Sequence, residues 1–164
     1  MRKYIYFLAA IMLLVVAGCS SLSSAEKAER QAAQIRAVAE SLSNRHYTIG
    51  VRTMYPPRGI AKQVSYGYNV EVRGDTLVSY LPYIGRAYNI PYGGGKGLNF
   101  TAPISEYNTR KDAKGTTYIT ILVNNDEDIL TYLLTVYEKG QADIDVRARE
   151  RDPISYSGEW QQDQ

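Results

Sequence analysis

The eight residues from Ala142 to Arg149 read Ala-Asp-Ile-Asp-Val-Arg-Ala-Arg, with apolar and charged residues in strict alternation. Successive side chains of a β-strand point to opposite faces, so this period of two predicts a strand with one buried side and one solvent-facing side. A half-buried strand of this kind is typical of an antiparallel sheet that covers a core with one face only. The stretch is the clearest evidence in the chain for the class of the fold.

The segments next to this strand continue the sheet in both directions. We expect strands over residues 118–123, 129–137 and 154–160, with turns at 124–128, 138–141 and 151–153. The turn at 124–128 carries alternate oxygen-bearing residues, as calcium loops do. It lacks the central glycine and the distal glutamate of the EF-hand loop, so we expect a solvated hairpin turn there.

The earlier part of the chain predicts four more strands. Residues alternate over 47–55 and 66–72, and the segments 76–81 and 98–104 follow. In the first of these strands we expect one face to carry Tyr47, Ile49, Val51, Thr53 and Tyr55. Between 72 and 76, Gly74-Asp75 predicts a two-residue type II′ hairpin turn, because glycine accepts the positive φ of the first central position.

One helix is expected in the mature chain, over residues 25–42. Ser23 and Glu26 have the spacing of a capping box, which satisfies the first free N–H groups of a helix. The apolar residues recur at helical spacing: Ala28, Ala32, Ile35, Val38 and Leu42. The sequence therefore predicts a mainly β fold, a single antiparallel β-sandwich or barrel-like domain with one N-terminal α-helix, with an α+β fold as the alternative.

The first 18 residues predict a lipoprotein signal peptide that is cleaved. Arg2 and Lys3 precede an apolar run that is shorter than the ~20 residues of a membrane-spanning helix. The run ends at Val16-Ala17-Gly18-Cys19, which resembles a bacterial lipobox and implies lipidation of Cys19. We therefore expect a lipidated tether over 19–24, one domain over 25–160 and a tail over 161–164.

This N-terminus also predicts where the protein is found. A lipid on Cys19 would hold the protein at a membrane of the cell envelope without crossing it. No acidic residue directly follows Cys19, which favours the outer membrane with the protein facing the periplasm, and exposure at the cell surface is the alternative. Removal of residues 1–18 lowers the number of basic residues from 19 to 17, equal to the 17 acidic ones. A neutral chain has little attraction for phosphate backbones, so we expect no nucleic-acid partner.

The residues available for catalysis are few, and we expect no catalytic residue, no metal site and no cofactor. Cys19 is the only cysteine and His46 the only histidine. The glycine-rich run at 93–97 lacks the Ser or Thr that a phosphate-binding loop needs after its lysine. Acids that could form a hydrolytic pair are present, but no pattern brings two of them together: Glu106, Asp112, Asp143 and Asp145.

The segment 79–104 is the candidate binding surface. It joins two predicted strands by a long connection with three prolines and a glycine cluster, and such connections are often functional. Its candidate ligand-contacting residues are Tyr80, Tyr83, Arg86, Tyr88, Tyr92 and Lys96. Tyrosine offers a large apolar face and a hydroxyl group, and arginine can clamp a carboxylate or phosphate. The structural alternative is that the tyrosines pack the open end of the sheet and Arg86 pairs with a local carbonyl or acid.

From this surface we predict a non-enzymatic binding or assembly module with an envelope glycan, peptide or protein as its partner. Two alternatives remain open at this point. One is a carboxylate-dependent hydrolase that acts on envelope glycan or peptide, and the other is a purely structural envelope protein. Convergence of the tyrosines and Arg86 on an open cleft, or of two carboxylates within it, would separate these functions.

Five segments resemble a family that is catalogued as domain of unknown function 4251, found in lipoproteins of Gram-negative anaerobes. They are Tyr55–Gly59, Gly67–Asp75, Ser79–Tyr88, Pro91–Gly95 and Phe100–Ile104. The run Ser-Tyr-Leu-Pro-Tyr-Ile-Gly-Arg-Ala-Tyr at 79–88 is the most specific of them. The resemblance covers most of residues 26–160, implies an envelope lipoprotein and transfers no catalytic residue. In such lineages Asp75-Thr76-Leu77 is also similar to an O-glycosylation sequon, which implies Thr76 as the modified residue.

Overall fold

The computed structural model describes residues 23–89 and 95–162, and within them one helix and nine strands. The helix is α2 (Ser24–Ser43). The strands are β1 (His46–Tyr55), β2 (Lys62–Gln63), β3 (Asn69–Arg73), β4 (Thr76–Leu81), β5 (Leu98–Lys111), β6 (Thr117–Asn124), β7 (Ile129–Val136), β8 (Gln141–Ala148) and β9 (Ile154–Gln161). No helix in the described part of the chain is long and apolar enough to span a membrane.

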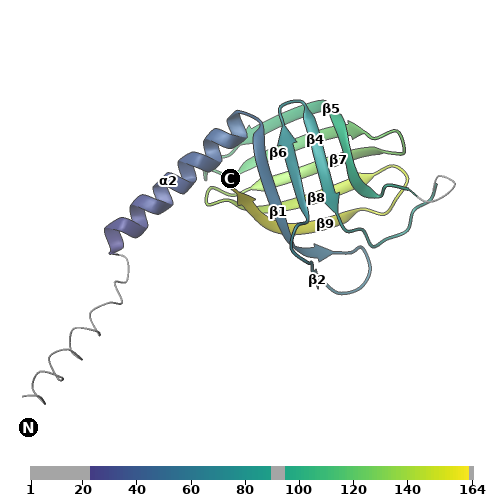
Figure 1. The fold of residues 1–164 in the computed structure, drawn as a ribbon, viewed down its shortest axis with the longest axis horizontal. Coiled ribbons are helices and arrows are strands. Elements are labelled where there is room, and N and C mark those ends of the chain that lie inside the picture. Colours follow the sequence, from purple (N-terminus) through teal and green to yellow (C-terminus); the bar gives the residue numbers. More distant parts are fainter. Residues whose placement is uncertain (1–22, 90–94, 163–164) are drawn as a thin grey trace, which may run out of the picture. The chain divides into compact units, whose positions relative to one another are not determined.

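Eight of the strands form a closed antiparallel barrel (Figure 1). Each strand pairs with the next in the order β1-β3-β4-β5-β6-β7-β8-β9, and β9 pairs back onto β1. The short β2 adds to β1 alone, beside Thr53 and Met54. The predicted mainly β fold with one N-terminal helix is confirmed, and of the two expected arrangements the barrel is the one observed. The pairing of β9 with β1 removes the two edges that these strands would expose in an open sheet.

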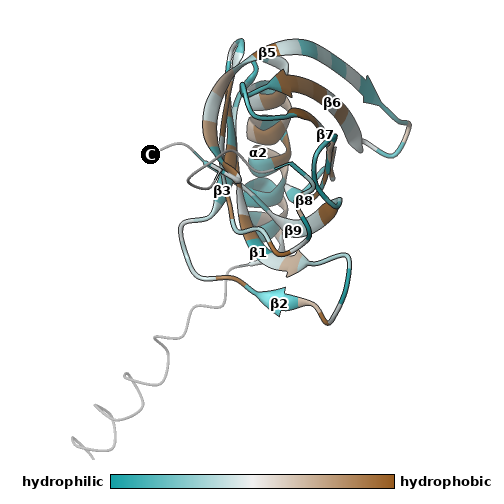
Figure 2. Cartoon of the chain, turned by 90° about the vertical axis from the view of Figure 1, so that its right-hand side faces the viewer, coloured by the Kyte–Doolittle hydropathy of each residue, from teal (hydrophilic) through white to brown (hydrophobic). Residues whose placement is uncertain are grey.

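The strand that most clearly predicted the sheet has the expected orientation. Ala142, Ile144 and Val146 of β8 are buried in the barrel, and the charged residues between them face outward. In Figure 2 the hydrophobic colour is strong along β6, which lines the same interior and is separated from β8 by β7. The turn between β3 and β4 also agrees with the prediction, since Gly74 has a φ of 61° and Arg73 pairs with Thr76.

Strand β1 departs from the regular alternation that its sequence predicts. A β-bulge between Val51 and Thr53 shifts its register against β9, so that Met54 is buried and Tyr55 faces solvent. A bulge places one extra residue in one strand, and every side chain beyond it changes face. Our expectation that Tyr47 and Tyr55 share one face was therefore wrong, while Tyr47, Ile49 and Val51 are buried as expected.

Three tyrosines fill much of the barrel interior. Tyr47, Tyr132 and Tyr156 are the largest fully buried side chains, and each hydroxyl group has a hydrogen-bond partner. The Tyr132 hydroxyl donates to Ser79 Oγ at 2.9 Å, and the Tyr156 hydroxyl donates to the Pro82 carbonyl at 2.7 Å. The hydroxyl groups of Tyr47 and Tyr107 lie 3.2 Å apart. Burial of a tyrosine is favourable when its polar end is satisfied in this way.

The chain divides into two compact units, Met1–Ala33 and Gln34–Gln164, and α2 spans the division. In the first unit, the backbone N–H of Glu26 donates to Ser23 Oγ and Glu26 Oε2 accepts from the Ser23 N–H, so the predicted capping box is confirmed. In the second unit, Gln34 Nε2 donates to the Lys139 carbonyl at 2.8 Å, and Val38 packs against Gly140. The helix ends at Ser43, close to the predicted boundary.

Candidate functional site

The connections between antiparallel strands alternate between the two ends of the barrel, and they are unequal in length. Short turns at 74–75, 112–116 and 137–140 lie at one end, which we call the short-turn end. The connections 56–68, 82–97, 125–128 and 149–153 lie at the other, which we call the long-loop end. The candidate segment of the sequence is one of these longer connections. The barrel therefore brings it beside the residues that precede β7 and β9.

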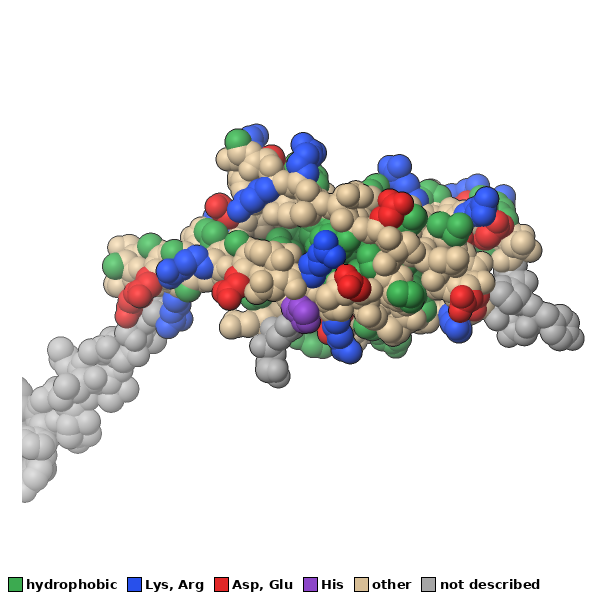
Figure 3. Space-filling view, turned by 90° about the horizontal axis from the view of Figure 1, so that it is seen from above, with side chains coloured by type: hydrophobic (Ala, Val, Ile, Leu, Met, Phe, Trp, Pro, Cys, Tyr) green, Lys and Arg blue, Asp and Glu red, His purple; other side chains and the backbone are tan. Residues whose placement is uncertain are grey.

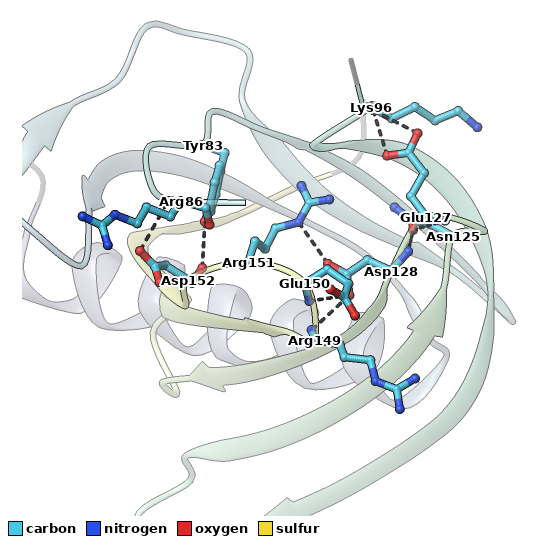
Figure 4. A network of polar contacts seen from close by, with 10 residues as sticks. All are labelled: Tyr83, Arg86, Lys96, Asn125, Glu127, Asp128, Arg149, Glu150, Arg151 and Asp152. Carbon is cyan, nitrogen blue, oxygen red and sulfur yellow. Dashed lines mark hydrogen bonds and ion pairs between the residues drawn. The ribbon is translucent and has the colours of Figure 1, made fainter. Parts of the chain in front are cut away.

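A buried ion pair lies at the centre of the long-loop end. Arg151 Nε donates to Asp128 Oδ2 at 3.0 Å, and the two side chains are 7% and 0% exposed. Asp128 Oδ1 accepts two further hydrogen bonds, from the backbone N–H groups of Arg149 at 3.0 Å and Glu150 at 3.1 Å (Figure 4). The carboxylate thus receives three donors, which is what a buried charge requires. The connections 125–128 and 149–153 are joined at this point.

The turn at 125–128 is itself organised by a side chain. Asn125 Oδ1 accepts from the N–H groups of Glu127 at 3.2 Å and Asp128 at 2.9 Å. Asn125 and Asp128 are both buried, so the expectation of a solvated turn was wrong for these two residues. The Glu127 carboxylate faces the other way and accepts from the Lys96 backbone N–H at 2.9 Å (Figure 4). The end of the candidate segment is therefore attached to this turn.

The start of the candidate segment is attached to Asp152. The Asp152 carboxylate accepts from the Arg86 backbone N–H at 3.2 Å and from the Tyr88 hydroxyl. The hydrogen of the Tyr83 hydroxyl is shared between the carbonyl oxygens of Arg86 at 2.9 Å and Asp152 at 3.0 Å. Backbone pairing of Ala87 with Arg151 completes the attachment. Residues 82–89 therefore follow one fixed path across the end of the barrel.

These contacts change the acidity of the groups involved. The hydrogen bond from the Tyr88 hydroxyl, followed by the one from the Arg86 N–H, lowers the pKa of Asp152 below its ordinary value of 3.8. The same bond to the carboxylate raises the pKa of Tyr88. Burial is the main cause that raises the pKa of Tyr83, whose ring lies 5.7 Å from the Arg151 guanidinium carbon. At neutral pH Asp152 is ionised and both tyrosines are neutral.

Part of the attached segment faces solvent. Ile84 is 41% exposed and Tyr88 is 66% exposed. Arg86, which lies between them in the sequence, is also exposed. Arg58, from the connection after β1, is also exposed and close enough to Tyr88 and Asp152 to influence their titration electrostatically. We call Arg58, Ile84, Arg86 and Tyr88 the loop surface. It presents an aliphatic side chain, an aromatic ring and two cations, and all of these except Arg58 lie on the fixed path of residues 82–89.

The other residues predicted for this surface lie elsewhere or have another role. Tyr83 supports the segment from below through its hydroxyl group. Tyr80 lies on β4, where it is 49% exposed and stacks on Tyr68 with ring centroids 5.0 Å apart. The Lys96 side chain is exposed beside Glu127, and Tyr92 lies outside the described residues. Cys19 also lies outside them, and Thr76, the first residue of β4, is partly exposed beside the turn.

The residues that fix the segment were missed in the sequence. Asp128 and Arg151 are separated by the whole of β7 and β8, and neither stands in a motif that predicts a pair. The only signal was the polar character of the two turns, and we interpreted that of 124–128 as exposure to solvent. Asp152 was part of a turn that we treated only as a break between strands.

The arrangement is suited to binding more than to acid–base chemistry. The oxygens of Asp128 and Asp152 are occupied by donors from the protein itself. Among residues 23–89 and 95–162, no group of three His, Cys, Asp or Glu residues is placed to hold a metal ion. The exposed groups are a phenol ring, two guanidinium groups and an aliphatic side chain, which can contact a ligand by stacking, by hydrogen bonding and by charge.

Comparison with known proteins identifies the family. The family model for the domain of unknown function DUF4251 matches residues 29–160. No curated protein matches the chain. The crystal structure of a DUF4251 family protein from Bacteroides eggerthii DSM 20697 is similar, with a TM-score of 0.62 at 15% identity, over 80% of this chain and 89% of that one. The chain therefore belongs to the DUF4251 family.

Proposed function

We propose that this protein is a lipid-anchored component of the cell envelope, and that its barrel is a non-enzymatic binding or assembly module. The module uses the loop surface, of which Ile84, Arg86 and Tyr88 lie within the segment 80–100. The observation that carries the proposal is that a segment so firmly attached still leaves Ile84, Arg86 and Tyr88 exposed. Fixed exposed groups of this kind reduce the entropy that is lost when a partner binds.

The chemistry of the surface favours a neutral or anionic partner. Among the described residues, no carboxylate lies within ion-pair distance of the Arg86 or Arg58 guanidinium groups. Both are free to contact a carboxylate or a sugar hydroxyl of a ligand. The ring of Tyr88 offers a face for stacking on a sugar or a peptide side chain. An envelope glycan or peptide fits these groups.

The anchoring part of the proposal rests on the sequence. Val16-Ala17-Gly18 before Cys19 supports cleavage and lipidation at that cysteine. The serine-rich tether without an acidic residue supports the outer membrane, facing the periplasm. Modification of Thr76, which lies beside the exposed β3–β4 turn, would be compatible with an extracytoplasmic location.

The non-enzymatic part of the proposal rests on the carboxylates of the site. A general acid in a hydrolase keeps its proton at neutral pH because its pKa is raised. The pKa of Asp152 is lowered instead, by hydrogen bonds that also hold the segment in place. A reaction at Asp152 would require these hydrogen bonds to break, and Arg86 and Tyr88 would then no longer be held in place.

The experiment is affinity purification of the full-length lipoprotein from native envelopes, with mass spectrometry of the bound proteins and glycans. Arg86→Ala is compared with Arg147→Ala, which removes an exposed arginine on β8. We expect a partner that is retained by the wild type and by Arg147→Ala and is lost with Arg86→Ala. The purified partner should then show the same order of affinities in a binding titration. Identical profiles for both variants would overturn the proposal for this surface.

A further inference from the structure

Strand β5 is longer than the strand that it pairs with on one side. Its first part, from Leu98 to Pro103, pairs with β4, and the Ile104 N–H donates to the Asp75 carbonyl in the β3–β4 turn. Residues 105–111 continue beyond that turn, where 105 lies in a bulge and 106–111 pair with β6 only. Within the described part of the chain, no strand pairs with their other edge. Figure 2 shows this part of β5 in hydrophilic colours.

The hydrogen bonds of the hairpin identify which backbone groups face the open edge. The Asp112 N–H donates to the Thr116 carbonyl and so points toward the β6 side. Backbone groups of successive residues in a strand point in opposite directions. The N–H and C=O groups of Tyr107, Thr109 and Lys111 therefore face away from β6. The bulge between Ile104 and Glu106 explains why the Ile104 N–H already faces away from β6, toward Asp75.

A groove runs along this open edge. It has a volume of about 390 Å³, and its lining includes all three residues with outward-facing backbone groups. Its opposite wall is the last turn of α2, with Ala39, Leu42 and Ser43. Figure 3 shows hydrophobic side chains on the floor of a hollow on this side of the barrel, with Lys and Arg side chains around it.

The charged residues that line the groove are both cations. The Arg45 guanidinium lies 4.3 Å from the centre of the Tyr107 ring, and its ion-pair partner, Asp75, is 91% exposed at a distance of 3.3 Å. Lys111 has no ion-pair partner among the described residues. The hydrogen bond between the Tyr107 and Tyr47 hydroxyl groups holds the floor of the groove in place.

We propose that the open edge of β5 at residues 105–111 binds an extended acidic peptide of a second protein as an added strand. The backbone of the peptide pairs with Tyr107, Thr109 and Lys111, and one apolar side chain enters the groove beside Leu42. An acidic side chain of the peptide contacts Lys111 and Arg45. In such strand addition the backbone bonds give affinity and the alternate side chains give selectivity. This site lies at the short-turn end and is independent of the loop surface.

The test uses a random peptide library and full-length protein in detergent. The peptides that are enriched should be acidic and strand-forming, and a synthetic copy of one of them is then titrated against variants. Thr109→Pro removes one outward N–H group and leaves the β6 pairing intact, since proline is tolerated at a strand edge. We expect it to abolish binding. Lys111→Glu should weaken binding by about tenfold or more, and Arg147→Glu on β8 should leave it unchanged.

Three results would overturn the proposal. The first is that no acidic peptide is enriched. The second is that the enriched peptide binds Thr109→Pro as well as it binds the wild type. If that variant does not fold, a peptide N-methylated at alternate residues replaces it on the wild-type protein and should fail to bind. The third is self-association of the wild type in sedimentation experiments that is lost with Lys111→Glu. That result would show that a second copy of this chain occupies the edge.

Discussion

Arg151 Nε lies 3.0 Å from Asp128 Oδ2, and this buried ion pair joins two connections of the barrel. The segment that carries the loop surface is attached to the residues on both sides of this pair. The architecture of the site therefore depends on an arginine that faces inward, while Arg86 is exposed to solvent.

The two arginines should respond differently to substitution. Arg151→Ala leaves the buried carboxylate of Asp128 without its cation, and we expect a loss of about 3–5 kcal/mol in the free energy of unfolding. Arg86→Ala removes an exposed side chain and should change it by less than about 0.5 kcal/mol. Urea denaturation followed by circular dichroism measures both. Equal losses for the two variants would show that Arg86 is part of the architecture and would remove the main support for the loop surface.

The closure of the barrel between β1 and β9 predicts a second pair of variants. A Cβ atom on Gly158 would clash with the carbonyl oxygen of Gly50, which is part of the backbone of β1 and not the end of a flexible side chain. A Cβ atom on Gly50 would meet only the end of the flexible Gln161 side chain. We expect Gly158→Ala to destabilise the protein by about 1–3 kcal/mol or more, and Gly50→Ala to cost much less. Thermal unfolding of both variants and the wild type measures which variant loses more stability. If β1 and β9 did not pair, Gly158→Ala would not be the more destabilising of the two.

The lowered pKa of Asp152 predicts that the stability of the protein depends on pH in the acidic range. Its pKa in the folded protein is below the ordinary value of 3.8, so the ionised form contributes stability above that value. This contribution is lost as the pH falls through the folded pKa. Asp152→Asn should therefore be less stable than the wild type at neutral pH, and the difference should shrink toward pH 3. Denaturation at a series of pH values measures it, and a difference that stays constant would be inconsistent with the shift.

The lipobox predicts the behaviour of a single-residue variant. Cys19→Ala removes the atom that would carry the lipid, and it should release the protein from the membrane fraction or block its processing. Fractionation of cells, with mass measurement of the mature N-terminus, distinguishes wild type from variant. A processed Cys19→Ala protein that still sediments with membranes would contradict lipid anchoring at this residue.

The parts of the fold that could be predicted are those that depend on local pattern. The alternation of Ile144 and Val146 with charged residues is a property of consecutive residues, and it located β8 correctly. The same holds for the capping box at Ser23 and for the turn at Gly74. Local pattern failed in β1, where the bulge adds one residue and so reverses the faces that the following side chains occupy. The bulge is set by pairing with β9 and not by the strand's own sequence.

The candidate site shows the same division between local and distant effects. The sequence selected the segment 79–104, and residues 82–89 within it follow one fixed path, to which the restricted φ of Pro82 contributes. The sequence could not distinguish Tyr83, which supports the path, from Tyr88, which faces solvent. That distinction depends on Asp152, which is 64 residues away from Tyr88 in the chain. No spacing rule relates residues that meet only when a barrel closes.

The bulge in β1 also limits how this strand can change in evolution. Arg52 has no partner in the pairing with β9, so its loss would restore regular alternation while Met54 stays inside the barrel and Tyr55 stays outside. Loss of the bulge with every residue retained would instead turn Met54 outward and place Tyr55 in a filled interior. A homologue with a gap at this position is therefore expected to keep an apolar residue where Met54 stands. A homologue without the gap is expected to keep the bulge.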